Sequence, residues 1–326
     1  MPSTLFELAE RNNVSLPMHD PAYHSPDALL ERYKKFSSLD DFLKYYYRAM
    51  SVLLNKRDFE DLTYAYLKRA HDDGVIHAEM FFDPQAHLER VSFETVIGGV
   101  EAGRRRAEKD FEMSTIVIMC FLRHLGQEPA LELFHDQAVQ TYLRNGTITG
   151  IGLDSSEIGY PPELFQMVYE EAQQMGLRLT AHAGEEGPAA NIKTSLDVLR
   201  CQRIDHGLRI TENGDLMKRI ASDGMLLTLC PLSNVNLKCL RDVSHAPIRT
   251  FLSEGIAFSI NSDDPAYLGG FILENYCAVQ EAFSLTVEEW ELVCLHAING
   301  SWCPEQRKVQ MRRKLTEVLQ KTSTKV

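Results

Sequence analysis

The sequence lacks the features that mark secreted, membrane-spanning and nucleic-acid-binding proteins. Its seven cysteines are an odd number and contain no Cys-x-x-Cys pair, which favours reduced thiols over a disulfide framework or a thiolate zinc site. No apolar run reaches the length of a membrane span, and no secretory signal begins the chain. A formal net charge of −12 at pH 7 disfavours phosphate backbones and anionic membranes as partners. We therefore expect neither a nucleic-acid nor a membrane partner, and a cytoplasmic location, with the nucleus left open as a second compartment.

No linker or low-complexity stretch divides the chain either, so we expect residues 1–326 to form a single domain. Short runs rich in β-branched residues alternate with longer helical patterns, which is typical of a parallel sheet built from strand–helix units. Seven runs predict strands, at residues 76–82, 115–121, 148–153, 178–181, 203–204, 225–229 and 257–260. Residues 4–73, before the first run, are expected to be mostly helical.

A parallel sheet of this length closes most naturally into a (β/α)8 TIM-type barrel, whose functional residues lie at the carboxyl ends of the strands. Seven strands leave that barrel one short. Nothing within residues 1–73 combines β-branched density with strand length, so we favour a chain that begins after the place of the first strand. The predicted fold class is an α/β barrel that lacks its first strand.

Polar clusters follow three of the predicted strands. His182-Ala183-Gly184-Glu185 places an acid three residues after a potential metal ligand, and Asp205-His206-Gly207 adds a second imidazole. Asp263 and Asp264 follow the apolar run 256–260, and burying adjacent carboxylates is costly without a cation or another positive partner. Taken alone, the His182 motif is explained more readily by a hydrogen-bonded core histidine, and the Asp263-Asp264 pair about as readily by a turn or a helix N-cap. Together, at the strand ends of one barrel, they indicate a mononuclear metal site that activates water.

These motifs resemble those of the adenosine and adenine deaminase family of metal-dependent (β/α)8-barrel hydrolases, and the resemblance covers nearly the whole length. The matching stretches are His182-Ala183-Gly184-Glu185, Ile204-Asp205-His206-Gly207, Leu229-Cys230-Pro231-Leu232-Ser233-Asn234 and Asn261-Ser262-Asp263-Asp264-Pro265. Residues 78–87, 122–125 and 152–157 look like the adenine deaminase branch of that family. The resemblance implies an amidohydrolase-like barrel.

It also implies a reaction, the hydrolytic deamination of adenine to hypoxanthine and ammonia in purine salvage, with one Zn2+ per chain and a small purine base as partner. His182 and Asp263 would be zinc ligands. Glu185 would donate a proton to a purine ring nitrogen, His206 would orient and stabilise the attacking hydroxide, and Asp264 would contact the base. The resemblance leaves the oligomeric state open.

One family feature has no counterpart in this chain. The family carries a His-x-His motif on its first barrel strand, and both histidines bind zinc, whereas no His-x-His pair occurs here. His19 and His24 are the nearest N-terminal histidines, but their odd separation would place them on opposite faces of a strand. Two protein ligands are fewer than the three that a catalytic zinc normally has, so we expect the chain as written to bind zinc weakly or not at all and to lack activity. A sequence that starts too late, from a misplaced start codon, is our preferred interpretation.

Two other functions remain open. The first is a non-catalytic paralogue that binds a purine or a partner protein without metal, although adjacent buried carboxylates at Asp263 and Asp264 would gain nothing there. The second is deamination of adenosine or of an N6-substituted adenine. We hypothesise that larger polar groups such as Glu157 occupy the room that a ribose needs, which would favour the free base.

Overall fold

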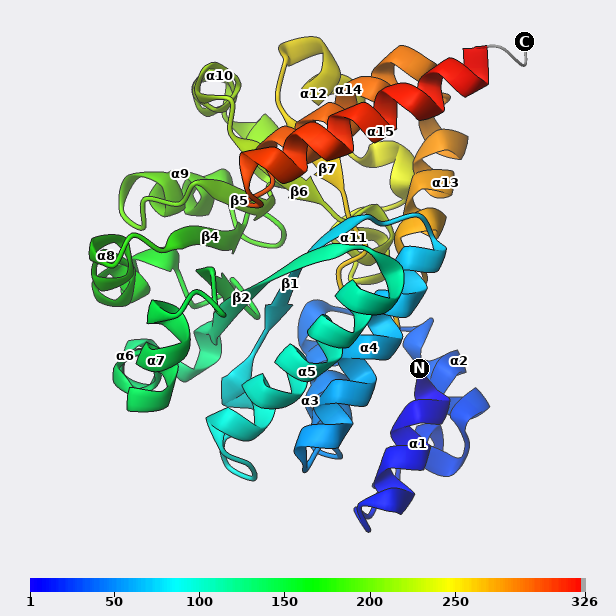
Figure 1. The fold of residues 1–326 in the computed structure, drawn as a ribbon, viewed down its shortest axis with the longest axis vertical. Coiled ribbons are helices and arrows are strands. Elements are labelled where there is room, and N and C mark those ends of the chain that lie inside the picture. Colours follow the sequence, from blue (N-terminus) through cyan, green and yellow to red (C-terminus); the bar gives the residue numbers. More distant parts are fainter. Residues whose placement is uncertain (324–326) are drawn as a thin grey trace.

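The computed structural model describes residues 1–323, and its centre is one sheet of seven parallel strands. Each strand pairs with the next along the chain, in the order β1-β2-β3-β4-β5-β6-β7 (Figure 1). The strands are β1 (His77–Phe82), β2 (Ser114–Leu122), β3 (Gly150–Asp154), β4 (Arg178–Ala183), β5 (Arg203–His206), β6 (Leu226–Leu229) and β7 (Phe258–Ile260). All seven predicted strands are confirmed. The largest differences are two residues at an end: β3 begins two residues later than predicted, and β4 and β5 continue for two residues into the histidine motifs that follow the apolar runs.

Helices fill the connections between the strands. Those before β1 are α1 (Pro2–Arg11), η1 (Pro21–His24), α2 (Pro26–Tyr33), α3 (Leu39–Met50) and α4 (Lys56–Asp72). Those between β1 and β4 are η2 (Pro84–Ala86), α5 (Phe93–Phe111), η3 (Arg123–Leu125), α6 (Gln127–His135), α7 (Gln137–Arg144), η4 (Pro162–Phe165) and α8 (Gln166–Gln174). Those after β4 are α9 (Ala189–Asp197), η5 (Leu208–Glu212), α10 (Gly214–Asp223), α11 (Pro231–Asn236), η6 (Val243–His245), α12 (Ile248–Glu254), α13 (Ile272–Phe283), α14 (Val287–Gly300) and α15 (Glu305–Ser323). None of the helices in the described residues is long and apolar enough to cross a membrane.

The region before β1 is helical, as its sequence predicts, and it covers the loop after β7. Ser25 and Ser38 cap α2 and α3 by accepting backbone N–H groups, which fixes where each helix begins. Rings of the two helices then pack on Tyr267, with centroids 5.0 Å away for Tyr33 and 5.5 Å away for Phe42. This aromatic cluster holds the segment that follows Asp264, so the amino-terminal helices help to position a predicted site residue.

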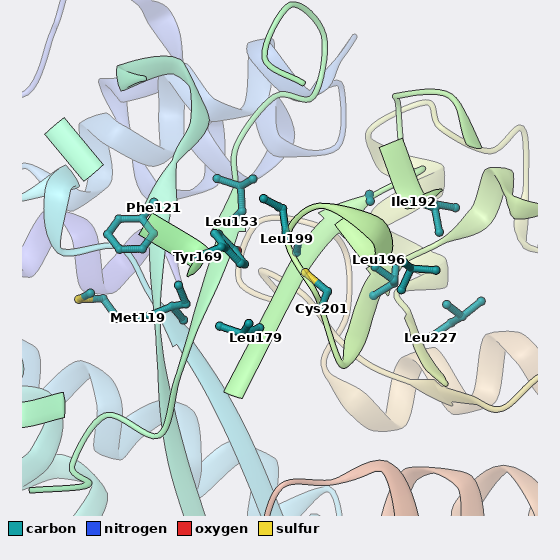
Figure 2. Close-up of a cluster of buried hydrophobic side chains, with 14 of the residues drawn as sticks. Met119, Phe121, Leu153, Tyr169, Leu179, Ile192, Leu196, Leu199, Cys201 and Leu227 are labelled. Atoms are coloured by element: carbon teal, nitrogen blue, oxygen red, sulfur yellow. The ribbon is translucent and has the colours of Figure 1, made fainter. Parts of the chain in front are cut away.

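The largest apolar core lies between the strands and the helices that cover their outer face. Figure 2 shows part of this core, where Leu153 of β3 lies beside Tyr169 of α8. The Tyr169 hydroxyl is fully buried and donates a hydrogen bond of 2.6 Å to the carbonyl of Thr180. The packing therefore holds β4, whose carboxyl end carries His182, in a fixed position relative to α8.

The curled sheet is open on one side within residues 1–323, because β1 pairs only with β2 and β7 pairs only with β6. Residues of both edge strands line a cavity of about 1120 Å³. This arrangement agrees with the expectation of a (β/α)8 barrel with one strand fewer.

A buried ion pair crosses the interior of the curled sheet. Arg203 of β5 donates a hydrogen bond to Glu79 of β1, and its guanidinium lies 3.8 Å from the centre of the Trp302 ring. The backbone N–H of Trp302 donates to the same carboxylate over 2.5 Å. These contacts tie two non-adjacent strands to the segment between α14 and α15.

Candidate active site

The structure brings all five predicted site residues to one cavity. His182 lies near the carboxyl end of β4, Glu185 lies in the turn that follows, and His206 is the last residue of β5. Asp263 and Asp264 follow β7, and all five side chains line the cavity of about 1120 Å³. The strand ends of a parallel sheet meet at one edge, which is why motifs far apart in the sequence converge here.

Three of these side chains could hold a metal ion. One ligand atom each of His182, His206 and Asp263 lie within 4.8 Å of one another, and the two imidazole centroids are 4.8 Å apart. Burial and the neighbouring His206 lower the pKa of His182 to about 3, so its imidazole is neutral. Its Nδ1 atom is buried and has no hydrogen-bond partner among the described residues, as expected of a ligand-ready imidazole. Two imidazoles and a carboxylate form a donor set that suits zinc. The structure thus adds His206 to the pair that the resemblance implied.

Glu185 is a buried acid beside this group. Its side chain is 5% exposed, and Oε1 accepts a hydrogen bond of 2.8 Å from Nδ2 of Asn234. Burial is the main reason that its pKa rises to about 7; the negative charge of Asp263 adds to the rise, while His206 opposes it. A carboxyl group with this pKa retains a proton for a large part of the time at neutral pH, which suits a general acid.

His206 is held between these groups in an unusual backbone conformation. Its φ angle is +64° and that of Asp263 is +54°, both in the left-handed region that glycine favours. The Nδ1 atom of His206 lies 3.1 Å from Nδ2 of Asn234 and 3.6 Å from Oε1 of Glu185. Burial lowers the pKa of His206, but the charges of Glu185 and Asp263 outweigh burial and leave this pKa raised. Left-handed conformations at two site residues indicate strain that the surrounding packing maintains.

Sequence reasoning gave no role to Ser233 and Asn234, which the structure places at the centre of the site. Both lie on α11, directly after β6, and are fully buried. The Ser233 hydroxyl donates to Oδ2 of Asp263 over 2.6 Å, and the Asn234 amide contacts Glu185 and His206 as described above. The motif that contains them was matched to the family, and its position at a strand end was the available signal.

Asp83 and Asp154 were missed as well. They follow β1 and end β3, and ligand atoms of these two residues and of Cys120 lie within 4.8 Å of one another. Tyr46 donates a hydrogen bond of 2.9 Å to Oδ2 of Asp83. The Oδ1 atoms of both carboxyl groups are buried and have no partner among the described residues. Burial, and then the negative charge of Asp83, raise the pKa of Asp154 well above its ordinary value. Like charges this close cannot both be ionised at low cost.

The structure does not support the hypothesis that Glu157 excludes a ribose. Its carboxylate accepts hydrogen bonds from the backbone of the loop after β4, and its side chain is not among those that line the cavity. Backbone N–H groups of that loop satisfy the charge, so the side chain turns away from the site. Asp264 does line the cavity, and burial together with the charges of Asp263, Asp83 and Glu185 raises its pKa well above the ordinary value.

A parallel barrel-type sheet, a His, His, Asp group and a buried acid with a raised pKa at its carboxyl edge define a metal-dependent hydrolase of the amidohydrolase type. The family model described as adenosine deaminase matches residues 1–318. The chain belongs to this family, in its adenine deaminase branch.

Sequence relatives agree with this placement. The chain is 51% identical over 311 residues to an adenine deaminase of Schizosaccharomyces pombe, with 95% of this chain and 85% of the relative covered. It is 49% identical over 321 residues to an adenine deaminase of Aspergillus oryzae, with 98% and 91% covered.

Solved structures give the same picture. An adenine deaminase from Arthrobacter aurescens matches with a TM-score of 0.92 and 40% identity, over 98% of this chain and 95% of the other. An amidohydrolase from Burkholderia ambifaria, solved with bound Zn, matches with a TM-score of 0.87 and 26% identity, over 99% and 88%.

Proposed function

We propose that this protein is an adenine deaminase that hydrolyses adenine to hypoxanthine and ammonia. The observation that carries the proposal is Glu185, a buried acid whose pKa is raised to about 7 and which lies 3.6 Å from His206 of the potential metal group. Hydrolysis of a ring carbon–nitrogen bond needs both a proton donor and a nucleophile, and this arrangement provides a place for each. Relatives that are 51% and 49% identical in sequence carry the name adenine deaminase, which supports the choice of substrate.

We propose zinc as the metal, held by His182 and Asp263 with His206 beside them. The neutral imidazole of His182 and the carboxylate of Asp263 are zinc ligands by chemistry, and the Ser233 hydroxyl orients the carboxylate. When bound, zinc lowers the pKa of its water to roughly 7 and so makes a nucleophile available at neutral pH. His206, whose ring centroid lies 4.8 Å from that of His182, would orient and stabilise the nucleophile.

The remaining residues act on the purine. Protonated Glu185 donates its proton to the ring nitrogen next to the carbon that bears the amine, which makes this carbon electrophilic. Asn234 holds the donor by its hydrogen bond to Oε1. Asp264 lines the same cavity, where its carboxyl group can form a hydrogen bond with the base. We further propose a cytoplasmic location, which is supported by the composition alone.

The test combines zinc content with ammonia release. Purified protein is loaded with zinc, and ammonia is measured with adenine, adenosine and N6-methyladenine as alternative substrates. Since His206 lies beside the two ligands that the resemblance implies, we expect the zinc-loaded protein to turn over adenine, although zinc binds weakly, and to turn over little of the other two. Turnover of the nucleoside or of the methylated base would contradict the choice of substrate. Zinc binding or purine binding without any ammonia would favour the non-catalytic paralogue. Asp263→Asn serves as the control, because it removes a proposed zinc ligand.

A further inference from the structure

The buried carboxylate of Glu157 accepts hydrogen bonds from the whole loop that carries Glu185. Oε1 of Glu157 accepts hydrogen bonds from the backbone N–H groups of residues 185, 186 and 187, over 2.8, 3.2 and 3.2 Å. Oε2 accepts the N–H of Gly184 over 3.0 Å and the side-chain amide of Asn191 over 2.8 Å. Glu157 is 4% exposed, so no solvent competes for these bonds. Five donors around one carboxylate leave the loop little freedom.

The loop has no regular structure of its own, and its glycines are shaped around this carboxylate. Gly184 has a φ angle of +70°, which a residue with a side chain rarely adopts. A Cβ atom on Gly187 would lie 2.5 Å from Oε2 of Glu157. Only a residue without a side chain lets the backbone at position 187 come this close to the Glu157 carboxylate.

Glu157 also stays ionised despite its burial. Burial opposes ionisation, but the positive charge of Arg123 and the hydrogen bonds of the loop outweigh it and lower the pKa of Glu157. Arg123 is fully buried and donates to the carbonyls of Tyr160, over 2.9 Å, and of His182. The ends of β2 and β3 thus supply two charged groups that reach behind the end of β4.

We infer that Glu157 is a positioning residue, which fixes the loop after β4 so that the carboxyl group of Glu185 faces the substrate. The inference rests on the proposed function, because Glu185 is the proton donor in that function. Glu157 does not line the cavity and therefore acts only through the loop. The hydrogen bonds of Glu157 fix the loop before substrate enters. Loss of these bonds should therefore affect the proton-transfer step more than binding of the base, which Asp264 contacts from a different strand end.

The test uses Glu157→Gln, with Glu163→Gln as a matched control on an exposed site of the same connection. The glutamine oxygen can still accept from the loop, but its amide group faces the N–H donors of Gly184 and Asn191. We expect amide hydrogen exchange of residues 184–187 to accelerate at least about tenfold, while the rest of the chain exchanges as before. For ammonia release from adenine we expect kcat to fall about 10–100-fold with KM changed less than about threefold. The control should change none of these quantities.

A second substitution provides a rescue. In Glu157→Gln with Asn191→Asp, the donor and the acceptor of one hydrogen bond exchange places and the buried negative charge near Arg123 returns. We expect this double variant to recover part of the loop protection and of kcat. Unchanged loop exchange and kcat in Glu157→Gln would overturn the inference, and so would a uniform rise in exchange over the whole chain, which indicates a general loss of stability. Because exchange is measured without substrate, a wild-type protein that releases no ammonia would overturn the proposed function and leave the exchange result independent.

Discussion

Asn234 shows how much a single side chain contributes to this site. Its Nδ2 atom contacts Oε1 of Glu185 at 2.8 Å and Nδ1 of His206 at 3.1 Å, so one amide sets the distance between the proton donor and the histidine. The relative position of the proton donor and of the histidine beside the potential metal group is thus fixed by a residue of a third strand end.

The first prediction concerns the proton donor. Glu185→Gln keeps the size of the side chain and can still accept from Asn234, but it has no acidic proton to donate. We expect ammonia release from adenine to fall about 10²–10⁴-fold, the usual contribution of a general acid. Zinc content, measured on the same sample, should stay unchanged. Glu186→Gln is the matched control, because its carboxyl group accepts from Ser156 and does not line the cavity, and its activity should stay within about twofold of the wild type.

The second prediction concerns Asp154, whose pKa is raised by burial and by Asp83. The folded protein holds a proton on this carboxyl group that the unfolded chain loses above its ordinary pKa, so the free energy of unfolding falls as pH rises through that window. Asp154→Asn cannot ionise, and we expect it to be more stable than the wild type at pH 8 by about 1–3 kcal/mol, the scale of an unsatisfied buried polar group.

Urea unfolding of this variant at pH 5 and pH 8 checks the prediction. The gain should be larger at pH 8 than at pH 5, because the wild type is penalised only where the carboxyl group is driven to ionise. Glu10→Gln removes an exposed charge and should show no such difference. A pH-independent gain, or a loss, would count against a raised pKa at Asp154.

The sequence predicted which motif residues lie together at the strand ends, but not which contacts single side chains make. His182, Glu185, His206, Asp263 and Asp264 converge as expected, because motifs at strand ends must meet at one edge. The role of Glu157 was misjudged, since the direction of a side chain after a strand depends on which backbone N–H groups are free nearby. Pattern alone contains no such information.

At the scale of elements, strand ends determine the chemistry and strand interiors determine the stability. β4, β5 and β7 each deliver a group to the site at the carboxyl edge, and β1 and β5 are joined inside the sheet by the Glu79–Arg203 pair. Although burial opposes ionisation, Arg203, His77 and the backbone N–H of Trp302 lower the pKa of Glu79 to about 2. The pair therefore remains charged over the physiological range.

The third prediction follows from this pair. Glu79→Gln removes the anion that is hydrogen-bonded to the Arg203 guanidinium, whose side chain is 5% exposed, and leaves it only the longer contact of 3.7 Å between Nε and Oδ1 of Asp205. We expect a loss of about 3–5 kcal/mol in the free energy of unfolding at pH 7, since one partner of a buried pair is removed. The stabilisation by Glu79 is present above its ordinary pKa and is lost as pH falls towards its folded pKa of about 2, so wild type and variant should converge in acid.

Urea unfolding of both proteins between pH 7 and pH 3 gives the comparison. Glu281→Gln, on the exposed surface of α13, is the matched control and should change stability by less than about 0.5 kcal/mol. A constant difference across the whole pH range would mean that packing, rather than charge, explains the effect.

The strand pattern was predictable because every strand is a short apolar run between helices. Boundaries shifted where polar residues take part in pairing: His182 pairs with Asp205, and Ala183 with His206, so β4 and β5 extend into their own functional motifs. The pattern of apolar residues cannot predict this extension, because backbone hydrogen bonds between strands form with polar as well as apolar side chains. The helices of residues 2–72 were expected, but their aromatic packing on Tyr267 was not.

At the scale of the whole molecule, the open side of the sheet and the potential metal group lie at the same cavity. Within residues 1–323 the ladder groups of β1 and β7 that face each other are unpaired, and both strands line the same cavity as His182 and Asp263. Unpaired edges of a parallel sheet favour association between chains. The number of zinc ligands and the closure of the sheet therefore have to be tested together, with variants that separate them.

The fourth prediction uses a chain extended upstream by one strand that carries His-x-His among alternating apolar residues. Such a strand can pair with both edges and place its two histidines on the same face, towards the cavity. We expect tighter zinc binding at about one ion per chain, faster adenine turnover, a higher melting temperature and less association than in the chain as written. In a second extended chain both histidines are replaced by alanine. It should keep the gain in melting temperature, because the sheet is still closed, but lose most of the zinc. If the chain as written already binds one zinc and turns over adenine as fast as the extended chain, the expectation of weak binding is wrong. The group of His182, His206 and Asp263 would then be sufficient by itself, and His206→Asn in the chain as written should remove the metal.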